Sequence, residues 1–208
     1  MRVFFCNLLL GFCVIIYGAQ CAIHSYSLFL FSMHGIIHYE LRKFVESRYG
    51  GAESWDALVS QAGLSDKLFF PNETYPDSDL VAILTAASAA TGKSVDELQR
   101  EFGEFMVPDL ATTYNAYIKK DWKLLDFLEN IENAIHGTVR RNNPGATPPK
   151  LSISRVSPTE VRIEYASERK MYGVLHGIFQ GVIHLYQEKV VVNVVAQTPV
   201  YVVKVVLA

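Results

Sequence analysis

The spacing of hydrophobic residues divides the chain into a helical first part and a strand-rich second part. From Met33 to Arg141, apolar residues recur every three or four positions, the period of an amphipathic helix. After a stretch containing Pro and Gly at 144–149, "LSISRVS" and "EVRIEYAS" alternate apolar and polar residues, which predicts a hairpin turning at Pro158. "MYGVLHGIFQGVIHLY" returns to helical spacing, and "KVVVNVVAQTPVYVVKVVLA" indicates a closing hairpin. The pattern predicts an α+β fold, with an N-terminal helical half followed by an antiparallel sheet with one long helix.

The segment "DWKLLDFLENIENAIHGTVRR" predicts the longest helix of the first half. Its apolar stripe runs through Leu124, Leu128, Ile131, Ile135 and Val139. The preceding helix, "SVDELQREFGEFM", opens with Ser94 and Glu97 at the spacing of a capping box.

Residues 1–32 form an apolar leader, and we predict that residues 33–208 form the domain. From Val3 to Tyr39 the chain contains no Asp, Glu, Lys or Arg. Three interpretations are open: a membrane anchor, a cleaved signal peptide, or upstream sequence before a true start at Met33. The expected localisation is cytoplasmic for the domain, with a membrane tether through residues 1–32 if the leader is a real anchor.

Composition excludes several classes of function. The formal net charge is -2, which provides no general attraction to nucleic acid. All three cysteines, Cys6, Cys13 and Cys21, lie in the leader. The domain therefore has no disulfide, no thiolate metal ligand and no cysteine nucleophile.

One pair of histidines and one single histidine are candidate ligands. His34 and His38 stand four apart on one predicted helix, a spacing that suits a metal pair, but no further ligand accompanies them. His136 stands at the edge of the apolar stripe of the long helix. A histidine in such a position is either a hydrogen-bonded packing residue or a ligand to a bound group.

Tyr165, Ser167 and Arg169 occupy alternate positions in "IEYASERKMY". On a strand, alternate side chains point to the same face, so these three would form one polar row. The row is either an ordinary solvated face or an anion site, in which Arg169 grips a carboxylate through two parallel hydrogen bonds. A porphyrin bound by one histidine and carrying two propionates would need such a row.

The combination of motifs resembles a known family. "NIENAIHGTVRRNNPGATPP" followed by "YASER" is similar to the heme nitric-oxide/oxygen binding (H-NOX) domain, which also supplies the sensor of soluble guanylate cyclase. The resemblance runs from Met33 to the closing hairpin. The family's usual Met-x-Gly start matches "MHG" at Met33, which favours the interpretation of residues 1–32 as upstream sequence. The resemblance implies a heme b cofactor (iron protoporphyrin IX) lying between the two halves.

The resemblance also implies roles for individual residues. His136 would be the proximal ligand of ferrous iron, and Tyr165, Ser167 and Arg169 would bind the heme propionates. The remaining heme contacts would come from Pro149, which would press against the porphyrin and bend it, and from Ile37 and Ile178, which would pack on the heme.

The residues on the side of the heme opposite His136, the distal side, would decide which gas is bound. Oxygen-binding members of the family carry a Tyr where this chain has Val174, and their two supporting polar positions correspond to Leu41 and Met106. The resemblance therefore implies stable NO and CO complexes and no stable O2 complex. Tyr39 or Tyr172 would weaken this expectation by turning inward, although Tyr172 lies on the opposite side of the predicted helix from Val174.

The sequence contains no phosphate loop, kinase signature or cyclase domain, so we expect a sensor without enzymatic activity. Its output would pass to a partner such as a histidine kinase or a cyclic-di-nucleotide enzyme, with no role for nucleic acid. The alternatives are a heme carrier, a heme peroxidase-like enzyme, and a structural membrane protein in which the Tyr-Ser-Arg row is only surface.

Overall fold

The computed structural model describes residues 32–208. Residues 1–31 of the predicted leader lie outside this range, and Ser32 begins the first strand, β1 (Ser32–His34). Within residues 32–208, no helix has the length and apolar character needed to cross a membrane.

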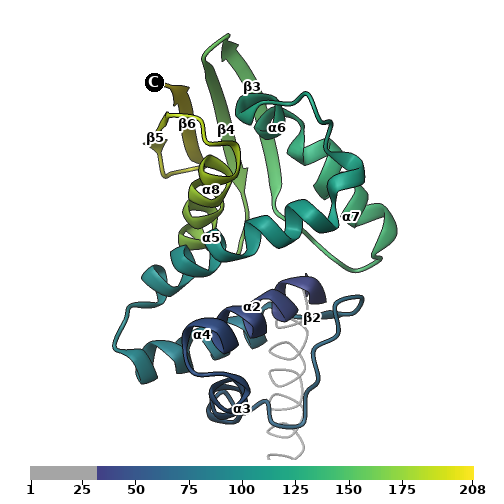
Figure 1. The fold of residues 1–208 in the computed structure, drawn as a ribbon, viewed down its shortest axis with the longest axis vertical. Helices are drawn as coiled ribbons and strands as arrows, with labels where there is room; N and C mark the ends of the chain where they lie inside the picture. Colours follow the sequence, from purple (N-terminus) through teal and green to yellow (C-terminus); the bar gives the residue numbers. More distant parts are fainter. Residues whose placement is uncertain (1–31) are drawn as a thin grey trace, which may run out of the picture.

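The predicted α+β fold is confirmed, with a helical half and a sheet half (Figure 1). The helices are α2 (Gly35–Arg48), α3 (Ala52–Gln61), α4 (Asp77–Thr91), α5 (Val95–Thr113), α6 (Leu124–Ile131), α7 (Gly137–Asn142) and α8 (Tyr172–Tyr186). The strands after β1 are β2 (Thr74–Pro76), β3 (Lys150–Ser157), β4 (Glu160–Ala166), β5 (Val190–Ala196) and β6 (Tyr201–Leu207). A 3-10 turn, η1 (Asn115–Tyr117), and a π-helical turn, η2 (Glu132–His136), complete the set.

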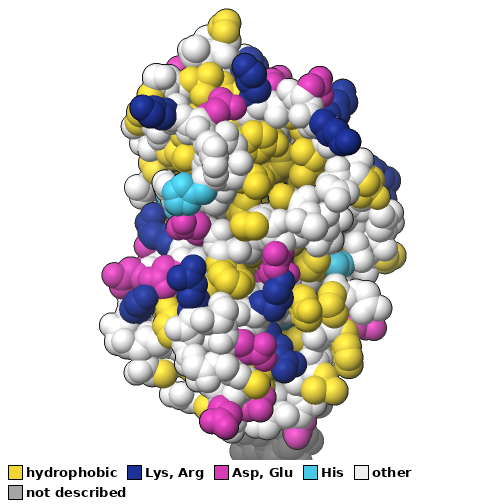
Figure 2. All heavy atoms as spheres, viewed as in Figure 1, with side chains coloured by type: hydrophobic (Ala, Val, Ile, Leu, Met, Phe, Trp, Pro, Cys, Tyr) yellow, Lys and Arg dark blue, Asp and Glu magenta, His cyan; other side chains and the backbone are white. Residues whose placement is uncertain are grey.

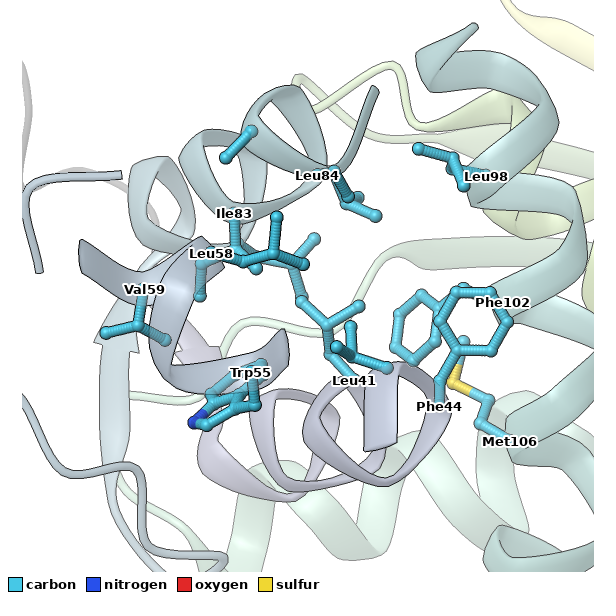
Figure 3. Close-up of a cluster of buried hydrophobic side chains, with 14 of the residues drawn as sticks. Leu41, Phe44, Trp55, Leu58, Val59, Ile83, Leu84, Leu98, Phe102 and Met106 are labelled. Atoms are coloured by element: carbon cyan, nitrogen blue, oxygen red, sulfur yellow. The ribbon is translucent and has the colours of Figure 1, made fainter. Parts of the chain in front are cut away.

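The helical half is built around one cluster of buried apolar side chains (Figure 3). α2 contributes Leu41 and Phe44, α3 contributes Trp55, and α5 contributes Phe102, all at most 5% exposed. The capping box predicted at Ser94 is present at the start of α5. Because several helices share this core, burial of apolar area holds them together more than local helix propensity does.

The second half is a four-stranded antiparallel sheet in the order β3-β4-β6-β5. Ile163 on β4 and Val203 on β6 pair in register and belong to a core that also contains Leu175 and Phe179 of α8. The outer surface carries interspersed acidic and basic side chains, with hydrophobic ones gathered over the upper part of the face in Figure 2. This mixture agrees with the small net charge.

Helices α5 and α8 approach closely because glycines line their contact. A Cβ atom on Gly177 would lie 2.1 Å from the carbonyl oxygen of Arg100, and one on Gly103 would lie 2.4 Å from that of Val174. Any larger residue would therefore collide with backbone. α5 thus contacts α2 and α4 on one side and α8 on the other, and it joins the two halves (Figure 1).

The prediction of one regular helix over residues 121–141 was wrong at its centre. α6 ends at Ile131, five residues form the π turn η2, and α7 begins at Gly137. The Gly137 N–H donates to the carbonyl of Glu132, five residues back, which is the hydrogen bond that defines a π turn. Such turns frequently mark functional sites, and this one ends at His136.

The prediction that Tyr165, Ser167 and Arg169 share one strand was also wrong. β4 pairs with β6 as far as Tyr165 and ends at Ala166. The chain then turns, with the Lys170 N–H donating to the Ser167 carbonyl at 3.3 Å. Ser167 and Arg169 therefore lie in the turn before α8, where strand alternation does not govern the direction of their side chains.

Candidate functional site

An apolar cavity of about 210 Å³ lies where the two halves meet. One group of lining residues comes from α5 and α8, and another comes from the stretch from α6 to α7. In the latter, Leu128, Ile131, Ile135 and Val139 belong to the apolar stripe seen in the sequence. Ile37 of α2 and the Pro148–Pro149 stretch complete the lining together with residues of the sheet half.

The structure brings most of the predicted site residues to this cavity. Those that line it are Ile37, Met106, His136, Pro149, Tyr165, Arg169, Val174 and Ile178. Two predicted residues lie elsewhere. Leu41 is fully buried in the core of the helical half, and the Ser167 hydroxyl accepts a hydrogen bond from the Arg169 backbone N–H at 3.3 Å.

His136 presents one imidazole nitrogen to the protein and leaves the other available. Its Nδ1 lies 3.0 Å from the Oε2 atom of Glu132, one turn earlier. Its Nε2 has no hydrogen-bond partner among the described residues, and the side chain lines the cavity while only 17% exposed. A neutral imidazole that carries its proton on Nδ1 is a metal ligand through Nε2.

The carboxylate of Glu132 is held in its charged form. Burial by itself would raise the pKa of Glu132, but hydrogen bonds from His136, Arg140 and the Leu151 N–H outweigh it and lower the pKa to about 2. Glu132 therefore carries a negative charge beside His136 at neutral pH.

At another part of the cavity lining, the guanidinium of Arg169 makes several hydrogen bonds. Its Nε donates to a carboxylate oxygen of Asp77, at the start of α4, and its Nη2 donates to the Ser32 carbonyl at 3.1 Å. Nη2 also donates to the Thr147 hydroxyl at 2.8 Å, and Nη1 donates to the Thr147 carbonyl. Arg169 thus already binds one carboxylate, the group that a heme propionate would present.

The tyrosines that could have altered the distal side do not line the cavity. Tyr39 is 41% exposed, and Tyr172 stacks on Tyr201 with ring centroids 4.2 Å apart. Tyr165 does line it and is 7% exposed, and its burial raises the pKa of its hydroxyl.

Three polar residues in the cavity lining were not assigned to it by sequence reasoning: His34, Tyr114 and Thr147. Tyr114 follows Met106 and Leu110 at intervals of four on α5 and its C-cap, so the spacing from Met106 could have revealed it. His34, the middle residue of "MHG", also lines the cavity, and its Nδ1 accepts the Ile36 N–H at 3.4 Å. Neither the Tyr114 hydroxyl nor His34 Nε2 has a hydrogen-bond partner among residues 32–208.

His34 and His38 lie in different surroundings. His38 is fully buried and stacks on Phe69, with ring centroids 4.8 Å apart, whereas His34 lines the cavity. Within the described range, no group of three or more His, Cys, Asp or Glu side chains could hold a metal ion. Burial, followed by the charge of Lys67, lowers the pKa of His38 to about 4.

Comparison with known proteins identifies the family and the fold. The model of the family described as Haem-NO-binding matches residues 34–194. The chain belongs to the Haem-NO-binding (H-NOX) family. A search of the curated proteins gave no match.

Several solved H-NOX structures are similar to this chain. An H-NOX protein from S. oneidensis, in its Fe(II)NO state, is 18% identical with a TM-score of 0.78, covering 85% of this chain and 99% of that one. An oxygen-binding H-NOX domain related to soluble guanylate cyclases is 26% identical with a TM-score of 0.73, covering 84% and 95%. A third structure, from a study of heme distortion in the H-NOX family, is 25% identical with a TM-score of 0.73.

The chemistry of the cavity fits the heme that H-NOX domains bind. Apolar walls suit a porphyrin, and a guanidinium at Arg169 suits a propionate. The Nε2 atom of His136, which has no hydrogen-bond partner within residues 32–208, suits iron. H-NOX domains are heme-based gas sensors without catalytic activity, so this chain is a sensor domain and not an enzyme.

Proposed function

We propose that this H-NOX domain binds NO and CO at a ferrous heme held by His136, forms no stable O2 complex, and signals to a partner protein in trans. The observation that carries the proposal is that the available Nε2 of His136 and the apolar Val174 belong to the same cavity. Bound heme supplies the iron that takes up the gas, and the chain supplies the ligand, the propionate contacts and the polarity of the gas site.

Of the proposed porphyrin and propionate contacts, Ile37, Pro149, Tyr165, Arg169 and Ile178 lie in the cavity lining. Arg169 and Tyr165 would bind the propionates, with Ser167 orienting Arg169 through its backbone N–H. A propionate would compete for the N–H donors of Arg169 with Asp77, Ser32 and Thr147, which accept hydrogen bonds from them.

The proposed gas preference follows from the polarity of the side chains that would surround the bound gas. Bound O2 carries partial negative charge, and a hydrogen bond to such an acceptor contributes roughly 1.5–3 kcal/mol, or about tenfold to a hundredfold in affinity. Val174 and Met106, both in the cavity lining, have no N–H or O–H on their side chains. NO binds ferrous iron tightly without that help, so an apolar site favours NO over O2.

Transmission would begin at the π turn. His136 ends η2, and Glu132 at the start of η2 accepts a hydrogen bond from the Leu151 N–H of β3 at 3.1 Å. If His136 were released from a bound iron, the segment from α6 to α7 would relax relative to the sheet. A partner would read this two-state change, and the expected class is a histidine kinase or a cyclic-di-nucleotide enzyme.

The test is spectroscopic. The full chain is purified with hemin, reduced, and its absorption spectrum is recorded under NO, under CO and in air. We expect a Soret band, stable NO and CO spectra, a five-coordinate NO form, and no lasting oxygenated spectrum. A colourless protein would refute the heme site, and a durable oxygenated form would refute the gas preference. Repeating the air experiment with Tyr114→Phe tests whether the missed hydroxyl contributes.

His136→Gly tests the iron ligand. Because the imidazole would be gone, we expect heme retention to fall and to be restored by added imidazole. Unchanged heme retention in this variant would show that another residue holds the iron.

A further inference from the structure

The carboxylate of Glu132 contacts the nitrogen of His136 that faces away from the proposed iron site. The Oε2 atom lies 3.0 Å from Nδ1, within hydrogen-bonding distance. Both side chains are only 17% exposed, so bulk water competes weakly for either partner. Of the two ring nitrogens, the structure therefore couples Nδ1 to a carboxylate and leaves Nε2 to the cavity.

Glu132 is itself fixed from two directions. Its Oε1 atom pairs with Nη1 of Arg140 at 2.8 Å, and its Oε2 atom accepts the backbone N–H of Leu151 at 3.1 Å. Arg140 lies in α7 and Leu151 lies in β3, so the carboxylate cannot rotate away from His136 without breaking contacts with both. The Glu132 carboxylate is therefore held in place beside His136, unlike a carboxylate in a solvent-exposed ion pair.

A carboxylate in this position changes the imidazole as a ligand. A metal-binding histidine that donates its second N–H to a carboxylate is held in one tautomer and orientation, and its ligating nitrogen becomes more basic. Loss of such a partner typically weakens metal binding about 10–100-fold. In the sequence, the only signal is a Glu four residues before the candidate ligand. In the structure, both residues belong to the π turn η2.

We propose that Glu132 is a positioning residue that sets the strength of the bond from His136 to the heme iron. It holds the proton on Nδ1, orients Nε2 toward the cavity and strengthens Nε2 as a donor. A more basic Nε2 would be harder to displace from bound iron, so the threshold for release of the helix by NO would be raised. This inference rests on the proposed role of His136 as the iron ligand.

The test compares Glu132→Gln with Glu129→Gln in the full-length, heme-loaded chain. Both variants remove one negative charge from α6 or η2, but Glu129 is 41% exposed and pairs with Arg155 instead of His136. We expect the iron–histidine stretching frequency of the ferrous protein, measured by resonance Raman spectroscopy, to fall in Glu132→Gln and to stay at the wild-type value in Glu129→Gln. The heme reduction potential should rise only in Glu132→Gln, and NO-induced release of His136 should be about tenfold faster.

Arg140→Met provides a variant with the opposite expected sign. Removing Arg140 takes away the cation that shares the Glu132 carboxylate, so more of its negative charge falls on His136. The stretching frequency should therefore rise. This variant keeps Glu132 and its contact with Leu151, and it remains informative if Glu132→Gln does not fold.

An unchanged iron–histidine frequency in folded Glu132→Gln would overturn the inference and leave Glu132 as a cross-link between helix and sheet. A fall in Arg140→Met would also overturn it. Failure of the proposed function gives a different result, because His136→Gly would then keep its heme and its iron–histidine band.

Discussion

The guanidinium of Arg169 pairs with the carboxylate of Asp77, which lies 92 residues earlier in the chain. Asp77 begins α4 in the helical half, and Arg169 lies in the turn that leads into α8 of the sheet half. The side chains are 16% and 9% exposed. This pair ties the two halves together at the cavity lining, where the heme propionates are proposed to bind.

Arg169→Gln should accelerate heme loss. The substitution removes a charge-assisted bond of roughly 1.5–3 kcal/mol, which corresponds to about a tenfold to hundredfold faster transfer of heme to an excess acceptor globin. Arg162→Gln on β4 is the matched control, because Arg162 is 39% exposed and pairs with Glu164. Equal transfer rates in the two variants would exclude a propionate role for Arg169. Thermal unfolding of both heme-free variants separates lost heme contacts from loss of the Asp77 pair.

Val174→Tyr should create an oxygen-binding site. A phenol at this position of α8 would supply the donor that the cavity wall lacks there, and O2 affinity should rise about tenfold to a hundredfold. Absorption spectra of the ferrous protein in air would measure the lifetime of the oxygenated form. Val174→Phe has nearly the same size without the hydroxyl, so it should not show the gain. If both variants behave alike, cavity shape and not hydrogen bonding controls the gas.

Gly177→Ala should destabilise the protein, because the new Cβ would lie 2.1 Å from the Arg100 carbonyl oxygen. Backbone cannot yield at that distance without separating α5 from α8, and overpacking of this kind costs about 1–3 kcal/mol. Urea unfolding measures the change in free energy of unfolding. Gln180→Ala, at an exposed position on the same helix, is the control and should change stability little. Wild-type stability of Gly177→Ala would mean that the two helices do not pack this closely.

His38 should make the protein less stable in acid. Its pKa is about 4 in the folded protein and about 6.5 when unfolded, because burial first and the Lys67 charge second disfavour the protonated ring. The unfolded chain therefore binds the proton more readily between these values. The stabilising contribution is complete above pH 6.5 and is lost as the pH falls toward 4.

As the pH falls from 7 to 4.5, the contribution of His38 to the free energy of unfolding decreases by about 2 kcal/mol. In His38→Phe the ring stack on Phe69 is kept and no proton is bound, so chemical unfolding at the two pH values should show a smaller fall than in wild type. His184→Gln, with a side chain 67% exposed, should retain the wild-type fall. A wild-type fall in His38→Phe would assign the acid sensitivity to other groups.

Periodicity predicted most of the secondary structure because it reports which face of an element is buried. The stripe from Leu124 to Val139 contributes to the cavity lining, and both hairpins of the sheet half are present. Periodicity failed at the π turn ending in His136, because one extra residue in a helical turn leaves the spacing of apolar residues nearly unchanged. It also failed at the end of β4, where Ser167 and Arg169 continue an alternating pattern after the pairing with β6 has stopped.

By itself, the sequence determined the fold class and the residue types available for a heme site, since both depend on short-range pattern and on motif. The tertiary structure alone decided which of these residues meet. It took Leu41 out of the cavity lining, brought Tyr114 and His34 into it, and joined Arg169 to Asp77. It also placed Glu132 between His136, Arg140 and Leu151. Contacts of this kind follow from how helices and strands pack against one another, which a local sequence pattern does not encode.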